Sequence, residues 1–148
     1  MAVRVQEADF DPGAELEALT AGDTDIGAVV SFTGLVRGGG GVEGMTLEHY
    51  PGMTEKALEA IEAEAHERWP LQASAIIHRV GPLAPGARIV FVATASRHRA
   101  AAFEAAEFLM DYLKTRAPFW KKEAMTDGTA HWVDARESDD GAAARWAR

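Results

Sequence analysis

A segment near the C-terminal third gathers side chains that could act on an anion. It runs from residue 110 to 123 and holds four cations and three aromatic residues, in a chain whose formal net charge is −8. Lys114 and Lys121 are its most useful groups, because a protonated lysine stabilises an anion. A lysine amine whose pKa falls below the usual ~10.4 instead attacks a carbonyl. Pro118 stands between them and favours a bend, so we expect the segment to aim lysines at a small anion.

The spacing within this segment predicts that the two lysines converge. Lys114 follows Met110 by four residues on a predicted helix, so both lie on one face at the C-terminal end of that helix. In the extended segment that follows, alternation places Phe119 and Lys121 on one side. A strand that returns along the helix end would bring Lys121 close to Lys114. Taken singly, Lys114 also fits a simple partner of the helix dipole, so the case for function rests on the combination.

Three further groups of cations occupy unusual places. The run Arg97-His98-Arg99 falls in the first turn of a long predicted helix, where each cation costs about 0.3–1 kcal/mol unless an anion binds there. Arg37 stands between a buried strand and the glycines 38–41, a place suited to a bidentate clamp on phosphate. Side chains extended into solvent are the alternative in both cases. The pair His78-Arg79 ends a predicted strand, and we expect simple surface exposure for it.

Composition limits the class of protein. At 148 residues, with 47% hydrophobic and 26% charged, the chain predicts one soluble domain spanning residues 1–148. The acidic balance argues against general nucleic-acid binding. No apolar run reaches the roughly 18–20 residues of a membrane span, and the N-terminus lacks a signal-peptide layout. The absence of cysteine fits a cytoplasmic protein and means that any sulfur chemistry needs sulfur from another molecule.

The helices and strands predicted to position these residues indicate an α+β fold with a mostly antiparallel sheet. Two main helices are expected, at 54–69 and from Ser96 to about Arg116. The tail from residue 135 to 148 is polar, and we expect it to be partly mobile. Strands are predicted at 3–5, 26–36, 45–50, 73–80, 88–95, 119–124 and 129–133, with a turn at 81–86 and a short helix at 14–19.

Two details of the main helices can also be predicted. Thr54 and Ser96 are of the types that cap helix N-termini. The spacing of apolar residues in the second helix predicts a buried stripe. Its members are Ala102, Phe103, Ala106, Leu109, Met110 and Leu113.

Several known motifs can be rejected from the letters. The pattern Gly39-x-Gly41-x-x-Gly44 matches a dinucleotide fingerprint, but a strand rather than a helix is predicted after it. The chain has no Walker lysine, no H-E-x-x-H and no serine at a nucleophile elbow. Its five histidines are scattered, and we expect no metal site and no cofactor. The glycines 38–41 predict a mobile loop that orders on binding a ligand.

Runs along nearly the whole chain resemble the large, catalytic subunit of molybdopterin synthase. They keep the family's order and spacing at Val29 to Arg37, Leu47 to Met53, His98-Arg99, Met110 to Glu123 and Trp132 to Ser138. The resemblance implies an α/β hammerhead fold and a homodimer of large subunits within a heterotetramer. A small ubiquitin-like sulfur-carrier subunit would dock at each end and insert its C-terminal Gly-Gly thiocarboxylate. Such a partner would explain a sulfur-handling enzyme without cysteine.

The reaction that the resemblance implies is transfer of two sulfurs, one from each of two partner molecules, to cyclic pyranopterin monophosphate. Lys114 would stabilise the oxyanion at the partner's acyl carbon or accept the acyl group. Lys121 would assist substrate activation and opening of the cyclic phosphate. The other implied binding positions are Leu35, Val36, Arg37, His98, Arg99, Lys122 and Glu123, with Arg136 as a weaker candidate and Phe32 and Met110 as apolar walls.

The chain departs from the family's pattern at one loop. The segment after Arg37 is shortened and made of glycines, and Leu35 stands where a lysine is common, which puts contacts through those side chains in question. Two other classes stay open. A non-catalytic module that binds an anion or a ubiquitin-like tail would form no product. A Schiff-base enzyme would trap a carbonyl substrate on Lys114 or Lys121 without any partner.

Overall fold

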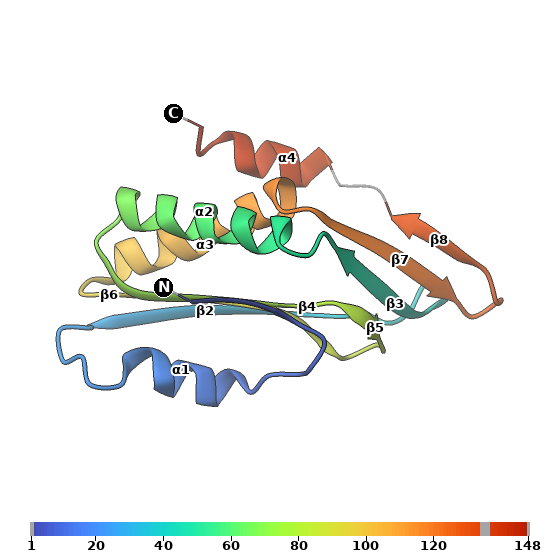
Figure 1. Ribbon diagram of the computed structural model, residues 1–148, viewed down its shortest axis with the longest axis horizontal. Helices are drawn as coiled ribbons and strands as arrows, with labels where there is room; N and C mark the ends of the chain where they lie inside the picture. Colours follow the sequence, from blue (N-terminus) through green and yellow to red (C-terminus); the bar gives the residue numbers. More distant parts are fainter. Residues whose placement is uncertain (1, 134–136, 148) are drawn as a thin grey trace.

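The computed structural model describes residues 2–133 and 137–147. Within these ranges, two four-stranded sheets and four helices form an α+β fold, as the sequence predicts (Figure 1). The elements are β1 (Ala2–Gln6), α1 (Pro12–Thr20), β2 (Ala28–Leu35), β3 (Val42–His49), α2 (Met53–Arg68), β4 (Leu71–Arg79), β5 (Gly81–Leu83), β6 (Arg88–Ser96), α3 (Arg99–Arg116), β7 (Phe119–Met125), β8 (Ala130–Val133) and α4 (Glu137–Ala144).

The first sheet has the order β1-β4-β6-β2 and is antiparallel except where β1 joins β4. The predicted pairing of β4 with β6 at its centre is confirmed. Helices α2 and α3 cover one face and α1 covers the other (Figure 1). Because both faces are covered, neighbouring residues of one strand bury in opposite directions. Ile76 packs under α2 and α3, while Ile77 packs with Phe10 on the α1 side.

Helix α3 forms because small and apolar residues recur on the side that faces the sheet. The predicted stripe is confirmed at Ala102, Ala106, Leu109 and Leu113, whereas Phe103 is 60% exposed. The buried face is rotated toward α2 and the tail. Phe108 and Tyr112 therefore take the large aromatic positions in the core.

The second sheet has the order β5-β3-β7-β8 and is antiparallel throughout. It projects from one end of the first sheet (Figure 1). Part of the predicted turn at 81–86 is a strand, since Leu83 pairs with Met45 of β3. Val36, Leu47, Met45 and Leu83 form a small core cluster at the junction.

The predicted cap Thr54 has a different role. Gly52 is the N-cap of α2, and Thr54 is fully buried. Its hydroxyl accepts a hydrogen bond from the Tyr50 amide and donates one to the carbonyl oxygen of Pro118, each at 2.9 Å. Thr54 thus ties the start of α2 to the bend that precedes β7.

The predicted cap Ser96 is also wrong. Its hydroxyl donates to the Pro70 carbonyl oxygen at 2.9 Å, and α3 begins at Arg99 with His98 as N-cap. Arg97 lies before the helix and pairs with Asp25 at 3.0 Å. Only Arg99 of the three cations therefore occupies the first turn.

Helix α4 lies within the C-terminal segment for which the sequence predicts a polar tail. Helix α4 packs on α3 (Figure 1). The Trp146 indole donates to Asp111 at 2.6 Å, and the Trp146 carbonyl oxygen accepts from Arg68 at 2.6 Å. Trp146 is thereby held against α2 and α3.

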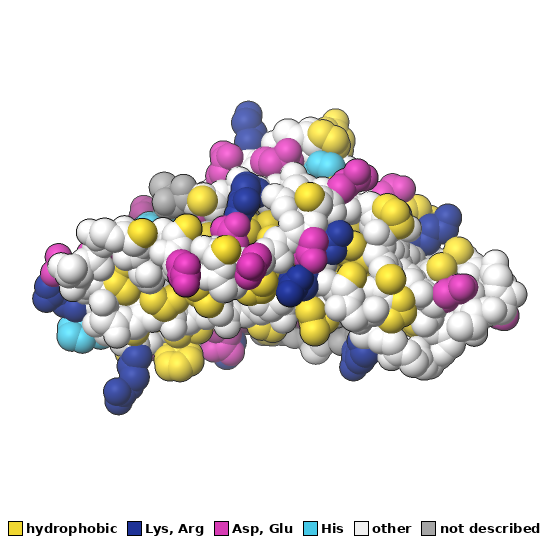
Figure 2. Space-filling model, turned by 90° about the horizontal axis from the view of Figure 1, so that it is seen from below, with side chains coloured by type: hydrophobic (Ala, Val, Ile, Leu, Met, Phe, Trp, Pro, Cys, Tyr) yellow, Lys and Arg dark blue, Asp and Glu magenta, His cyan; other side chains and the backbone are white. Residues whose placement is uncertain are grey.

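The surface on the α1 side carries mixed charge. In Figure 2, lysine and arginine side chains stand apart from one another among carboxylates, with hydrophobic side chains scattered between them. Among the described residues, no helix is long and apolar enough to cross a membrane.

Candidate active site

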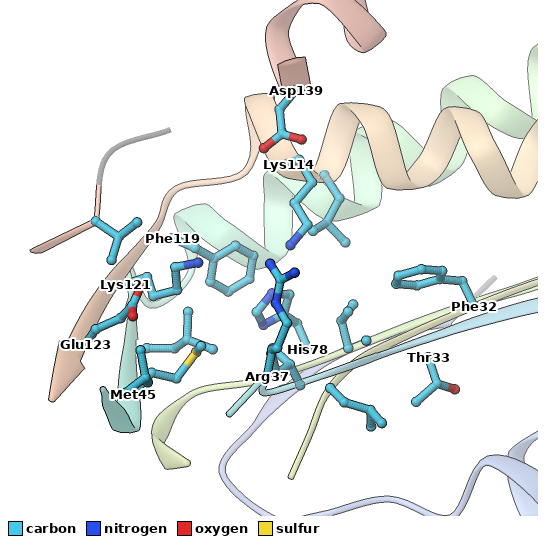
Figure 3. Close-up of a pocket in the computed structure, with 18 of the residues that line it drawn as sticks. Phe32, Thr33, Arg37, Met45, His78, Lys114, Phe119, Lys121, Glu123 and Asp139 are labelled. Atoms are coloured by element: carbon cyan, nitrogen blue, oxygen red, sulfur yellow. The ribbon is translucent and has the colours of Figure 1, made fainter. Parts of the chain in front are cut away.

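A pocket of about 670 Å³ opens where the two sheets meet. The end of β2, the end of β4, the end of α3 and the strands β3 and β7 form its walls, and α4 contributes from above (Figure 3). Its lining includes Phe32, Leu35, Arg37, Met45, His78, Lys114, Phe119, Lys121, Glu123, Val133 and Asp139.

Lys114 and Lys121 both line this pocket, as their spacing predicts. Helix α3 ends before Pro118, and β7 then runs back with an alternating pattern of exposure. Phe119, Lys121 and Glu123 consequently share the inner side of the strand. Figure 3 shows the amino groups of both lysines directed into the same space.

Arg37 reaches the pocket from the loop after β2 (Figure 3). The preceding residue, Val36, is buried in the junction core, and its amide donates to Ala87 at 2.8 Å. This anchor fixes the backbone from which Arg37 extends. The glycines that follow adopt positive φ at Gly39 (92°), Gly40 (60°) and Gly41 (80°), a region that glycine enters without strain.

His78 is a pocket residue that the sequence analysis placed on the surface. It is 3% exposed, and its ring stacks on Phe119 at 3.7 Å between centroids. Burial lowers the pKa of His78 to about 4. The hydrogen bond with the Arg79 carbonyl opposes this shift, and the charges of Lys114 and His49 lower the pKa by smaller amounts. The ring is therefore neutral at pH 7. Alternation offered a signal, because His78 shares a strand face with buried Ile76.

The described residues of the pocket carry a positive balance in an acidic chain. Among those that line it, three cations, Arg37, Lys114 and Lys121, face two carboxylates, Glu123 and Asp139, which gives a formal charge of +1 (3 − 2). The chain as a whole carries −8. Cations concentrated in a partly enclosed cavity favour an anionic ligand there.

Comparisons with known proteins identify the family. The model of the family described as "MoaE protein" matches residues 5–116. A molybdopterin synthase catalytic subunit from Pseudomonas aeruginosa is 62% identical over 149 residues, which cover 99% of each chain. The chain belongs to the molybdopterin synthase catalytic subunit family.

Solved structures of this family share the fold. A molybdopterin cofactor biosynthesis protein E from Burkholderia multivorans is 57% identical with a TM-score of 0.84, and covers 98% of this chain and 95% of its own. A molybdopterin synthase from Staphylococcus aureus is 34% identical with a TM-score of 0.80, over 88% of this chain and 95% of its own. The α/β hammerhead fold expected from the resemblance is thus confirmed.

Several of the positions suggested by the family resemblance meet in the pocket. Phe32 and Leu35 contribute from β2, and Glu123 lies two residues after Lys121 on the inner side of β7. Leu35 lines the pocket in spite of its departure from the family's lysine, so an apolar side chain takes that place here.

Other positions do not reach the pocket within one chain. His98 and Arg99 are exposed at the opposite end of α3, and 15 residues of helix separate Arg99 from Lys114 by about 22 Å. Lys122 points outward, with its ammonium 5.5 Å from the ring centroid of Trp132. Met110 packs half-buried against the helical core.

Two further expectations concern Arg136 and a metal site. Arg136 lies outside the described residues. Within residues 2–133 and 137–147, the structure brings together no group of three or more histidine or acidic side chains that could hold a metal ion.

Proposed function

We propose that the chain transfers sulfur from the C-terminal thiocarboxylate of a small ubiquitin-like subunit to cyclic pyranopterin monophosphate, forming the dithiolene of molybdopterin. Membership of the catalytic-subunit family supports this reaction. The observation that carries it for this chain is the meeting of Lys114, Lys121 and Arg37 in one pocket, whose described lining residues have a net positive charge. Both reactants, a thiocarboxylate and a cyclic phosphate, are anions that this pocket attracts.

Lys114 is the residue we assign to the partner's C-terminus. It lies in the last turn of α3 and lines the pocket. Its amine stabilises the oxyanion formed at the acyl carbon of the partner, or accepts the acyl group transiently.

Lys121 and Arg37 are the residues we assign to the pterin substrate. They enter the pocket from β7 and from the loop after β2, on different sides of the space (Figure 3). Lys121 acts as an acid or an electrostatic stabiliser when the cyclic phosphate opens. Arg37 binds phosphate oxygens through its planar guanidinium group.

A second copy of the chain completes this proposal. Strand β2 is an edge of the first sheet, and Val29, Phe32 and Phe103 leave large apolar side chains exposed beside it. A homodimer that covers this edge would bury them and bring His98 and Arg99 of one copy toward the pocket of the other. One sulfur-carrier subunit at each pocket then gives a heterotetramer.

Reconstitution tests the reaction. The purified chain is mixed with cyclic pyranopterin monophosphate and a thiocarboxylated ubiquitin-like subunit, and mass spectrometry follows the dithiolene product. The same partner with an ordinary C-terminal carboxylate is the control. We expect product only with the thiocarboxylate.

The alternative is a non-catalytic module that binds an anion or a ubiquitin-like tail. It predicts a stable complex with the partner and no product under any condition. A cytoplasmic location belongs to the proposal as well, and fractionation of cells that express the tagged chain tests it.

A further inference from the structure

His78 occupies the place where three parts of the pocket meet. It lies at the end of β4 in the first sheet, and its side chain reaches Phe119 of β7 in the second sheet. Lys114 at the end of α3 is close enough to lower the pKa of its imidazole. The two lysines of the proposed reaction thus enter the pocket near the rings of His78 and Phe119 (Figure 3).

The orientation of the His78 ring is fixed from behind. Its Nδ1 lies 2.8 Å from the carbonyl oxygen of Arg79. A carbonyl oxygen only accepts hydrogen bonds, so Nδ1 carries the proton. The backbone of the same segment is held by β1, where Val5 pairs with His78 and Gln6 with Arg79.

The face of the ring supports the start of β7. The planes of His78 and Phe119 are 17° apart at a centroid distance of 3.7 Å. Phe119 lies two residues before Lys121 on the same side of the strand. A shift of Phe119 would therefore move the backbone from which Lys121 extends.

The groups around His78 explain why a ring without charge suits this place. Lys114 faces it from α3, His49 from β3 and Phe119 from β7, while Arg37 lines the same pocket. A protonated imidazole would add a fourth cation beside Lys114. A neutral one supports both lysines without repelling them.

We propose that His78 is a positioning residue of this pocket: its ring, fixed by the Arg79 carbonyl, holds Phe119 in place and so sets where Lys121 stands relative to Lys114. This role rests on the proposed sulfur transfer and deepens it. His78 moves no proton and forms no bond with the substrate. It fixes the separation of two groups that must act on the same reactants, and misplacement by about 1 Å can cost up to 10²-fold in rate.

Two substitutions at His78 distinguish the contribution of the stacked ring from that of its hydrogen bond to Arg79. His78→Gln removes the stacked ring, whereas His78→Phe keeps a ring against Phe119 and loses only the hydrogen bond to Arg79. With thiocarboxylated partner and cyclic pyranopterin monophosphate, we expect kcat to fall at least tenfold in His78→Gln, with KM for the pterin changed less than threefold. We expect His78→Phe to recover most of the loss.

A histidine away from the pocket provides the matched control. His66 is partly buried and hydrogen-bonded to Ser74 at 2.7 Å, so His66→Gln perturbs the fold without touching Phe119. We expect its kcat to stay within twofold of wild type at a temperature where all variants are folded by circular dichroism. Equal kcat in wild type and His78→Gln, or equal losses in His78→Gln and His78→Phe, would overturn the role.

A second measurement does not need the reaction. A short amine-reactive cross-linker joins Lys114 to Lys121 when both amino groups face one space. Peptide mass spectrometry gives the yield of the cross-link. We expect similar yields in wild type and His78→Phe, and a several-fold lower yield in His78→Gln. If wild type forms no product, the sulfur transfer fails, but this yield still decides whether His78 places the lysines. An unchanged cross-link yield in His78→Gln would contradict the proposal that His78 positions the lysines.

Discussion

The two ends of α3 carry cations into different surroundings. At the C-terminal end, Lys114 meets a pocket to which β2, β4, β7 and α4 also contribute. At the N-terminal end, His98 and Arg99 stand exposed, where the dipole disfavours positive charge. One end is a site within a single chain. The other end gains a function only if it meets an anion on a second molecule, and we propose that it does so at the substrate pocket of a second copy.

The strongest test of this difference between the two ends of α3 is removal of the cation at the C-terminal end. Lys114→Ala should lower the rate of dithiolene formation about 10³-fold, because an oxyanion would lose a stabilising charge in a partly enclosed site. The measurement is single-turnover product formation by mass spectrometry. Binding of the partner, followed by size exclusion, should persist. A fall of less than tenfold would contradict the role of Lys114.

Opposite faces of β7 give a sharper version of the same test. Lys121→Ala should slow the reaction about 10²-fold, as expected for loss of a general acid or electrostatic stabiliser. Lys122→Ala is the matched control, since this neighbour points away toward Trp132 and should change the rate less than twofold. If both substitutions have the same effect, the inner face of β7 has no special role.

Acidification should lower the free energy of unfolding through protonation of His78, which lies near the C-terminal end of α3. The pKa of its imidazole is about 4 in the folded chain and 6.5 when unfolded. Between these values the unfolded state binds more protons, so the free energy of unfolding falls as pH drops, by about 3 kcal/mol in total. Urea unfolding from pH 7 to 4 measures it.

His78→Phe is the control for this pH dependence. It should show a shallower fall over the same range, because it lacks the His78 imidazole and keeps every other titrating group. Identical pH dependence in the two proteins would show that His78 does not titrate as described.

Mixing two variants of lowered activity tests the exposed end. Arg99→Ala should lower the rate about tenfold, the value of one lost charged hydrogen bond. Suppose that Arg99 acts across the dimer. In a mixed dimer of Arg99→Ala with Lys114→Ala, one pocket then lacks both Lys114 and Arg99, and the other pocket has both. Activity should therefore rise on mixing to well above that of Arg99→Ala alone, to which Lys114→Ala dimers add almost nothing. No recovery would mean that Arg99 serves its own chain or none.

Local periodicity predicted the parts of this molecule that depend on near neighbours. The strand pair β4–β6, the two main helices and the inner face of β7 all follow from alternation or helical spacing over a few residues. The convergence of Lys114 and Lys121 could be predicted because only six residues, including Pro118, lie between them. Such features need no knowledge of the rest of the chain.

Features set by distant partners were not predicted. Thr54 and Ser96 have the letters of helix caps, yet their hydroxyls donate to the carbonyl oxygens of Pro118 and Pro70. His78 was expected at the surface because its cover, Phe119, comes 41 residues later (119 − 78). Phe103 follows the helical spacing but lies on a side of α3 that the described residues leave largely exposed.

The parallel pairing of β1 has a consequence for the order of folding. Ala2 pairs with Ala75 and Val5 with His78, so each contact closes a loop of 73 residues (75 − 2 and 78 − 5). The antiparallel pair β4–β6 and the helices close far shorter loops and carry a smaller entropic cost. We therefore expect β1 to dock late, onto a hairpin that already exists. Because its last residues run beside His78 and Arg79, the floor of the pocket becomes rigid only when the first strand of the chain arrives.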